Sequence, residues 1–243
     1  MPVYNVENYI EKAVLSVLQQ TYANFELLII NDGTKDNSIQ KIEKYASDSR
    51  LKIFHKENGG LSDARNFGLE RAQGDYVYFM DSDDFIESDL LALCIDKIEK
   101  ENVPVVVFGY FLDTEDKSGN LISSESIIHE SEVINIENKN TTVTNNTIGL
   151  LGYAWNKFYA IDFLRQHNFK FEKGVSLVED ILFNAPVFSS VNSIHFINKP
   201  LYHYANRPTT TLIKTFHANS FDLYLKKNEC LKKFFNKWEI NHS

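Results

Sequence analysis

The clearest chemical potential in this sequence lies in four consecutive residues, Asp81, Ser82, Asp83 and Asp84, which hold three carboxylates. At about 6 Å and an effective dielectric of about 20, each pair of carboxylates repels by roughly 2–3 kcal/mol. A divalent cation would turn this repulsion into attraction. Asp81 and Asp83 face the same side of an extended chain, and oxygen ligands favour Mg²⁺ or Mn²⁺. Taken alone, the four residues are more simply an acidic turn that caps the next helix.

A second acidic position, Asp32, lies in the turn sequence of residues 31–33. A carboxylate here can accept a hydrogen bond from the imide N–H of uracil. The segment formed by Pro2, Val3 and Tyr4, just before the first expected helix, offers backbone against which a nucleotide base can lie. Neither feature is specific by itself, because Asn-Asp-Gly is a strong turn signal.

Both acidic positions follow segments that we expect to be buried strands. The first half of the chain alternates apolar runs with helical spacings of apolar residues, joined by short connections. This order predicts an α/β fold with a mostly parallel, Rossmann-like sheet flanked by helices, in which ligands bind beyond the carboxyl ends of the strands. The expected strands are 26–31, 51–56, 76–80 and 105–112, and the main expected helices are 7–21, 61–73 and 88–101.

The second half of the chain is less regular. Residues 113–147 are rich in Ser, Asn, Thr, Asp and Glu, which indicates a long surface excursion or a small peripheral hairpin. We expect a helix over 179–187, a strand over 194–197 and a Lys-rich amphipathic helix over 217–238. That last helix could rest on anionic lipid, although a solvated helix face is the simpler explanation of its lysines.

Composition excludes several classes of protein. The 243 residues are 43% hydrophobic and 24% charged, which is typical of a globular chain. The net charge of −8 argues against a nucleic-acid partner. Two cysteines, Cys94 and Cys230, give neither a disulfide framework nor a zinc spacing and indicate a reducing compartment. No apolar run approaches the roughly 18 residues of a membrane span, so any membrane attachment is expected to be peripheral or through segments absent here.

Eight short motifs follow one another in the first third of the chain: MPVYN at 1–5, QQTY at 19–22, FEL at 25–27, NDG at 31–33, NGG at 58–60, ARN at 64–66, GD at 74–75 and DSDD at 81–84. In this order they resemble the family 2 glycosyltransferases of GT-A fold, especially bacterial enzymes of capsule and exopolysaccharide assembly. The resemblance is dense to about residue 110 and continues more thinly through WNK at 155–157, ED at 179–180 and YHY at 202–204.

The resemblance implies that three parts of the chain have different roles. Residues 1–112 would bind the nucleotide sugar, residues 113–216 would form the acceptor-side and catalytic half of the same domain, and residues 217–243 would form a C-terminal amphipathic helix. Relatives place an apolar run before Pro2 as the first, central strand, which has no counterpart here. Losing a central strand leaves neighbouring backbone unpaired, so we expect that the natural reading frame starts upstream or that this product is truncated.

By the resemblance, Asp83 would be the direct metal ligand and Asp81 would lie near both ribose and metal, with Mn²⁺ or Mg²⁺ as cofactor. Asp32 would contact the uracil, Ser82 would contribute backbone contacts, and Arg65 would either approach the donor or brace the acidic turn. The full set of expected nucleotide-binding residues is Pro2, Val3, Tyr4, Asp32, Asn58, Gly60, Arg65, Asp81 and Ser82.

Asp180 matches the position of the family's general base, which takes the proton of the acceptor hydroxyl, and Glu179 would bind acceptor hydroxyls. Without the resemblance, this pair is an acidic first turn of a helix. Trp155 and Lys157 match a segment beside the sugar pocket, although core packing explains Trp155 as well. His203 would complete the metal shell, although a histidine between two tyrosines is more often structural.

Arg207 and Thr209 belong to a stretch that could cover the diphosphate. We therefore expect an inverting enzyme that moves a sugar from a UDP-sugar to a hydroxyl of a glycan or lipid-linked oligosaccharide in surface polysaccharide biosynthesis. Its expected place is the cytoplasmic face of the cell membrane, and a homo-oligomer is compatible with the sequence. A nucleotidyltransferase would need a basic, Gly-rich phosphate loop, which is absent. A non-catalytic nucleotide-sugar-binding subunit that stabilises a partner transferase stays open.

Overall fold

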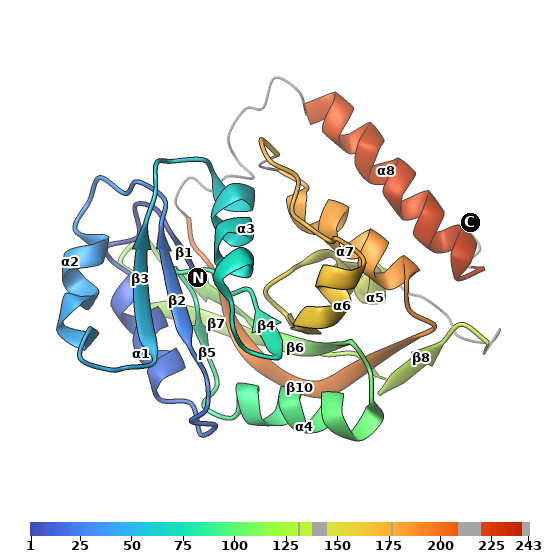
Figure 1. Ribbon diagram of the computed structural model, residues 1–243, viewed down its shortest axis with the longest axis horizontal. Coiled ribbons are helices and arrows are strands. Elements are labelled where there is room, and N and C mark those ends of the chain that lie inside the picture. The colour runs from blue at the N-terminus through green and yellow to red at the C-terminus, as the bar shows by residue number, and fades with distance from the viewer. Residues whose placement is uncertain (131, 138–144, 176, 209–219, 240–243) are drawn as a thin grey trace.

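The computed structural model shows an α/β protein whose strands form two neighbouring sheets (Figure 1). It describes residues 1–130, 132–137, 145–175, 177–208 and 220–239. The predicted α/β class is confirmed, with helices on both sides of the strands. Asp32 follows a strand of one sheet, and the acidic turn at 81–84 follows a strand of the other. The predicted site therefore depends on how the two sheets are placed relative to each other.

The first sheet is parallel throughout and has the order β1-β2-β3, formed by β1 (Pro2–Val3), β2 (Leu27–Asn31) and β3 (Leu51–His55). Its connections contain α1 (Ile10–Leu18), then α2 (Ser38–Ile42) with the short 3-10 helix η1 (Glu43–Tyr45). Pro2 and Val3 pair with Ile30 and Asn31 as a strand of two residues, which is shorter than β2 and β3. The expectation that an apolar strand belongs before Pro2 stays a prediction.

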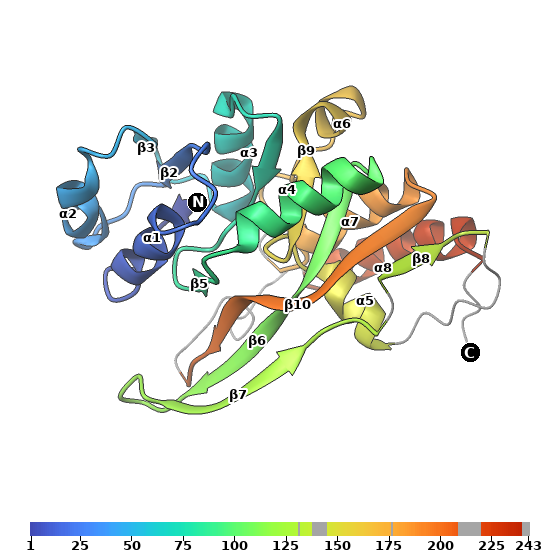
Figure 2. The same cartoon turned by 90° about the horizontal axis from the view of Figure 1, so that it is seen from below.

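The second sheet is mixed and follows the order β4-β9-β6-β10-β5, with β7 added to β6 and β8 added to β10. Only β6 and β10 pair in parallel. Its strands are β4 (Tyr76–Tyr78), β5 (Phe85–Ile86), β6 (Val105–Glu115), β7 (Leu121–Ile127), β8 (Val133–Asn135), β9 (Lys157–Ala160) and β10 (Ser193–Asn206). The predicted excursion after residue 112 is thus the β6–β7 hairpin, which reaches away from the body in Figure 2.

A glycine allows β6 to serve both the core and this hairpin. The first part of β6 pairs with β9, and its later part, from Tyr110, pairs with β7. At Gly109 a side chain has no room, because an added Cβ would lie 2.6 Å from the carbonyl oxygen of Ile127 and 3.1 Å from that of Lys199. Real Cβ atoms do not approach a backbone oxygen as closely as the first of these distances. The change of partner strand therefore requires glycine at this position.

Helices cover both faces of the second sheet. The helix α4 (Leu90–Glu101) lies against β6 and β10 on one side, and the opposite side carries α5 (Asn145–Gly152), α7 (Glu179–Ser189) and α8 (Ser220–Lys237) (Figure 1). The helix α3 (Leu61–Arg71) stands between the two sheets, and α6 (Ile161–Gln166) follows β9. None of the helices in the described ranges is long and apolar enough to cross a membrane.

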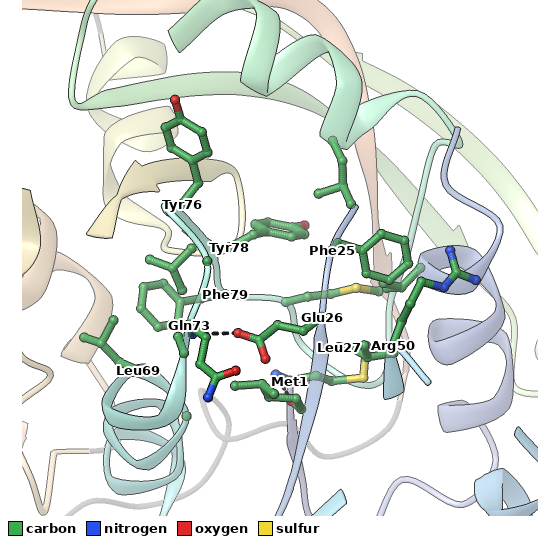
Figure 3. Close-up of a pocket in the computed structure, with 18 of the residues that line it drawn as sticks. Met1, Phe25, Glu26, Leu27, Arg50, Leu69, Gln73, Tyr76, Tyr78 and Phe79 are labelled. Atoms are coloured by element: carbon green, nitrogen blue, oxygen red, sulfur yellow. Dashed lines mark hydrogen bonds between the residues drawn. The ribbon is translucent and has the colours of Figure 1, made fainter. Parts of the chain in front are cut away.

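The two sheets are separated by a cavity of about 530 Å³. In Figure 3, Tyr76, Tyr78 and Phe79 line one side of it, and Leu27 lies on the other side with Met1 nearby. The cavity is lined by neither Asp83 nor the Glu179-Asp180 pair. It does, however, share Pro2 and Arg65 with the nucleotide-binding residues that the sequence predicts.

Candidate functional site

Arg65 brings the predicted site residues together. It lies in α3, which begins directly after Gly60 at a φ of +84°, and its side chain is only 1% exposed. Its Nη1 donates to Asp180 Oδ1 at 2.5 Å, and its Nη2 donates to Asp81 Oδ1 at 2.8 Å. Glu179 Oε1 is 3.9 Å from Nη1. One guanidinium thus joins the acidic turn after β4 to the first turn of α7.

The electrostatics of Arg65 are those of a buried cation among anions. Burial opposes its charge, but the carboxylates of Asp180, Asp81 and Glu179 outweigh burial and raise the pKa of Arg65. Its Nε atom is buried and has no hydrogen-bond partner among the described residues. The ring of Phe171 packs 5.1 Å from the guanidinium carbon. Removing the cation would therefore leave several carboxylates close together in a poorly hydrated place.

Asp180 and Glu179 differ sharply in their surroundings. The Oδ2 atom of Asp180 accepts the N–H of Ala154 at 3.0 Å, so each of its oxygens has a donor. Among the described residues, the ion pair of Glu179 is the longer contact to Arg65. Burial, and then the negative charge of Asp180, raise the pKa of Glu179 to about 7. A carboxyl group with a raised pKa beside a second carboxyl group is an arrangement typical of acid–base chemistry.

Asp83 is held by Arg207, which follows β10. Arg207 Nη2 donates to the carbonyl oxygen of Asp83 at 2.7 Å, and Nη1 donates to its Oδ2 at 3.3 Å. Arg207 also donates to Glu115 at 3.0 Å and packs over the ring of Tyr9. The side chain of Asp83 is still 45% exposed. Arg207 therefore lies beside the acidic turn, while Thr209 lies outside the described residues.

The remaining residues of the acidic turn have structural partners. Asp84 is 4% exposed and accepts hydrogen bonds from the hydroxyl of Tyr202 at 2.6 Å and from the N–H of Ala205 at 2.9 Å. Ser82 is also buried. The end of β10 therefore holds the turn in place, and Asp81 and Asp83 keep partly exposed carboxylates.

Asp32 organises the glycine loop that follows β3. Its carboxylate accepts the N–H groups of Gly59 at 2.9 Å and Gly60 at 2.8 Å and pairs with Lys56 at 2.5 Å, and Asn58 donates to its carbonyl oxygen. With 3% of its surface exposed, Asp32 shapes the loop in this structure rather than presenting a free carboxylate. The sequence analysis missed Lys56, whose position one residue after β3 was the available signal.

The aromatic residues Tyr153 and Trp155 differ in exposure from the expectation. Trp155 is 3% exposed and stacks between Tyr153 and Tyr202, with ring centroids at 4.6 and 4.5 Å, which favours core packing. Tyr153 is the more exposed ring at 38%, and burial, followed by the charge of Asp180, raises its pKa. Sequence reasoning missed Tyr153, although it stands two residues before the motif at 155–157. An exposed ring beside Asp180 can stack on a sugar.

Lys157 lies in the interior, which corrects its expected placement beside a ligand. Its Nζ is fully buried and donates to the carbonyl oxygen of Leu150 at 2.8 Å, to Asn156 Oδ1 at 2.7 Å and to the carbonyl oxygen of Tyr153. Burial lowers the pKa of this amine well below its ordinary value. Lys157 therefore satisfies the carbonyl groups at the end of α5.

His203 also has a full set of protein partners. Its Nδ1 is hydrogen-bonded to Asp113 and its Nε2 to Glu87, each at 2.8 Å. Its ring lies between those of Phe85 and Phe111, with centroids at 4.0 and 4.6 Å. Because both ring nitrogens are occupied by carboxylates, these contacts favour the structural interpretation of His203.

The two partly exposed carboxylates of the turn, Asp81 and Asp83, are oxygen ligands that suit a divalent ion. In the parts of the chain that the structure describes, no group of three or more His, Cys, Asp and Glu side chains is arranged to hold a metal ion. Mg²⁺, however, is commonly held by one or two carboxylates together with substrate phosphates. Partial burial, and then the charge of Asp81, raise the pKa of Asp83, so a cation would relieve an existing repulsion.

Comparison with known proteins identifies the relatives of this chain. Residues 1–164 match the family model described as glycosyl transferase family 2. The chain is 28% identical over 245 residues to the glycosyltransferase EpsJ of Bacillus subtilis, covering 99% of this chain and 70% of EpsJ. It is 35% identical over 212 residues to the glycosyltransferase GlyA of Streptococcus pneumoniae, covering 85% of this chain but 30% of GlyA.

The fold also matches solved structures. Residues 1–349 of Staphylococcus aureus TarS, crystallised in complex with UDP-GlcNAc, superpose with a TM-score of 0.77 at 23% identity, covering 97% of this chain and 65% of that structure. A mannosyltransferase from Pyrobaculum calidifontis in complex with GDP-Man and Mn²⁺ matches with a TM-score of 0.56 at 14% identity, covering 100% of this chain and 63% of that one. At these identities the likeness concerns the fold.

Proposed function

The chain belongs to glycosyl transferase family 2, and from this premise we propose that it transfers a sugar from a UDP-sugar to a hydroxyl of a glycan or lipid-linked oligosaccharide, with inversion, in the assembly of a surface polysaccharide. The observation that carries the proposal is the buried contact of Arg65 with both Asp81 and Asp180. This contact supports the proposal because one guanidinium joins Asp81, which would serve the donor, to Asp180, which would serve the acceptor.

On the donor side, Asp81 and Asp83 would hold a divalent ion, Mn²⁺ or Mg²⁺, which would neutralise the charge of the departing diphosphate. Arg207 would turn from Asp83 toward the phosphates, because a guanidinium binds phosphate oxygens in a bidentate manner. The loop that Asp32 orders, with Asn58 and Gly60, would lie beside the base, together with Pro2, Val3 and Tyr4 at the end of β1.

On the acceptor side, Asp180 would take the proton of the acceptor hydroxyl. The oxygen of that hydroxyl would bond to the anomeric carbon, and the bond from that carbon to the diphosphate would break. The two hydrogen bonds of Asp180 fix its orientation, and a carboxylate has further lone pairs for the hydroxyl. Glu179, with a pKa of about 7, would bind a neighbouring hydroxyl and is the alternative base. Tyr153 would offer its exposed ring to the sugar.

The test measures UDP release from a panel of UDP-sugars with Mn²⁺, with and without glycan acceptors. Asp83→Asn should weaken donor binding and abolish its dependence on Mn²⁺, and Asp180→Asn should keep donor binding while transfer falls by about 10²–10⁴-fold. Asp96→Asn, an exposed change on α4, is the matched control. Transfer that survives Asp180→Asn would refute the assigned base. Donor binding without turnover across the panel would favour a non-catalytic nucleotide-sugar-binding subunit.

We further propose that the reaction takes place at the cytoplasmic face of the cell membrane. The start of α8 supports this, because Phe221 is 72% exposed and is followed by the exposed Tyr224 and Leu225. The lysines of the same helix, such as Lys227 and Lys233, favour anionic lipid. Flotation with vesicles of anionic lipid should recover the protein, and replacing Phe221, Tyr224 and Leu225 by serine should abolish flotation.

A further inference from the structure

Lys157, the first residue of β9, is a buried cation to which the proposed mechanism gives no role. Its Nζ donates to three oxygens, which are the carbonyl oxygens of Leu150 and Tyr153 and the side-chain oxygen of Asn156. Three acceptors match the three N–H groups of an ammonium, whereas a neutral amine has only two. The geometry therefore favours the charged form of Lys157, in a place where an unpaired charge is costly.

The negative charge that acts on Lys157 is that of Asp180, in the first turn of α7. None of the three oxygens in contact with Lys157 carries a full charge, and Asp180 forms its own ion pair with Arg65. Burial lowers the pKa of Lys157, and the charge of Asp180 opposes this shift. The two side chains therefore interact electrostatically, although a backbone group lies between them.

That backbone group is the peptide between Tyr153 and Ala154. Its carbonyl oxygen accepts a hydrogen bond from Lys157, and its N–H, which points the opposite way in a trans peptide, donates to Asp180 Oδ2 at 3.0 Å. The negative end of the peptide dipole thus faces the ammonium, and the positive end faces the carboxylate. Hydrogen bonds that follow one another in such a chain polarise and strengthen one another. Rotating this peptide group would break both bonds at once.

We propose that Lys157 is a positioning residue for Asp180, because it holds the peptide group of Tyr153 and Ala154 in the orientation that keeps the N–H of Ala154 on Asp180 Oδ2. Arg65 holds the other oxygen of the carboxylate. Asp180 is then fixed from two sides and keeps further lone pairs for the acceptor hydroxyl. Lys157 itself touches neither donor nor acceptor. This inference rests on the proposed role of Asp180 in sugar transfer and adds a residue that acts through it.

The first test compares Lys157→Met with Tyr159→Phe. Methionine keeps most of the side-chain volume but has no N–H donor. Tyr159→Phe is the matched control, because Tyr159 is also fully buried on β9 and loses a hydrogen bond to Asn184, away from the peptide group in question. Lys157→Met should lower transfer by about 10–100-fold, while the affinity for UDP with Mn²⁺ stays within about twofold of the wild type. Hydrogen exchange at the Ala154 amide should become at least about tenfold faster than in the control.

A second measurement keeps Lys157 in place and so does not depend on the folding of Lys157→Met. Coupling between two sites is reciprocal, so removing the charge of Asp180 should lower the pKa of Lys157. In Asp180→Asn, the NMR resonance of the Lys157 Cε carbon should titrate at a pH about 1 lower than in the wild type. Asp96→Asn, an exposed change on α4, should leave this titration where it is.

Two results would overturn the proposal. One is an equal loss of transfer in Lys157→Met and Tyr159→Phe together with equal exchange at the Ala154 amide, because the loss would then follow from stability alone. The other is a Lys157 resonance that titrates at the same pH in the wild type and in Asp180→Asn. If no UDP-sugar is turned over, the proposed function fails, and the exchange and titration readouts still decide whether Lys157 positions Asp180.

Discussion

Among single residues, Arg65 has the largest share in setting the charge balance of the site. Its guanidinium faces the carboxylates of Asp81, Asp180 and Glu179, and nothing in the described residues replaces it as their cation. Lysine cannot take its place fully, because a point charge does not reach two carboxylates in different directions. The same contacts that assemble the site therefore also stabilise the fold.

Replacing Arg65 by methionine should destabilise the protein by roughly 3–5 kcal/mol, because the change leaves buried carboxylates without a counter-ion. Chemical denaturation followed by circular dichroism measures this loss. Arg71→Met, in the same helix but stacked on Phe67 at the surface, is the matched control and should cost far less. Equal losses for the two variants would show that the network around Arg65 contributes nothing particular.

Glu179 should make stability depend on pH. Its pKa is about 7 in the folded protein and 4.5 in its unperturbed state, so its stabilising contribution is complete below about pH 4.5 and is lost as the pH rises through 7. The shift corresponds to a loss on the order of 3 kcal/mol. Glu179→Gln should remove this part of the pH dependence.

The comparison requires unfolding free energies of both proteins from pH 4.5 to 8. The wild type should become progressively less stable than Glu179→Gln over this range. The exposed Glu43, replaced by glutamine, controls for the loss of any one carboxylate. A constant difference between wild type and Glu179→Gln across the range would contradict the assigned pKa.

Among the elements, β10 positions more of the site than any sequence pattern suggested. Tyr202 and Ala205 hold Asp84, and Arg207, directly after the strand, holds Asp83. The pairing of β10 with β5 places this strand end beside the acidic turn. The turn is therefore ordered by a segment more than a hundred residues further along the chain.

Tyr202→Phe should lower the free energy of unfolding by about 1–3 kcal/mol, because the buried carboxylate of Asp84 loses a donor that the phenyl ring cannot replace. Equilibrium denaturation measures the loss, and Tyr224→Phe on the exposed face of α8 is its control. If the two variants are equally stable, Asp84 is not anchored in the way described. The ring packing against Trp155 is preserved in the Phe variant.

The sequence analysis located elements that have a clear local sequence pattern. It missed short strands and contacts between residues that are far apart in the chain. The strands near 26–31 and 51–56 could be located because their apolar runs end in turn residues, and α7 because its acidic first turn precedes an apolar face. Strand β5 has two residues and β9 has four, which is too little for periodicity to reveal. The contact between Arg65 and Asp180 spans 115 residues of sequence, and the tertiary fold alone brings these two side chains together.

At the level of the whole molecule, the site lies where the two sheets meet. Asp32 follows β2 of the first sheet, Asp81 and Asp83 follow β4 of the second, and Asp180 lies in the first turn of α7. A nucleotide bound to all of these groups would connect the two sheets. Ligand binding should therefore stabilise the entire protein and not just one loop.

UDP with Mn²⁺ at about 100 times its dissociation constant should add about 2.7 kcal/mol of stability, which corresponds to a rise in Tm of about 5–10 °C. Differential scanning fluorimetry measures the rise, with UDP alone and Mn²⁺ alone as controls. Asp83→Asn should cancel the part of the rise that requires Mn²⁺ and leave the unliganded Tm nearly unchanged. A full rise in that variant would contradict the role assigned to Asp83.

The absence of a side chain at Gly109 also matters to anyone who rebuilds this protein. The trajectory of the β6–β7 hairpin is set at this position, where the carbonyl oxygen of Ile127 fills the place of a Cβ. A hairpin of different sequence should therefore be joined after Gly109, so that the glycine is kept. A hairpin grafted after Gly109 should leave the sheet at the original angle. A graft that replaces Gly109 should leave the sheet at a different angle.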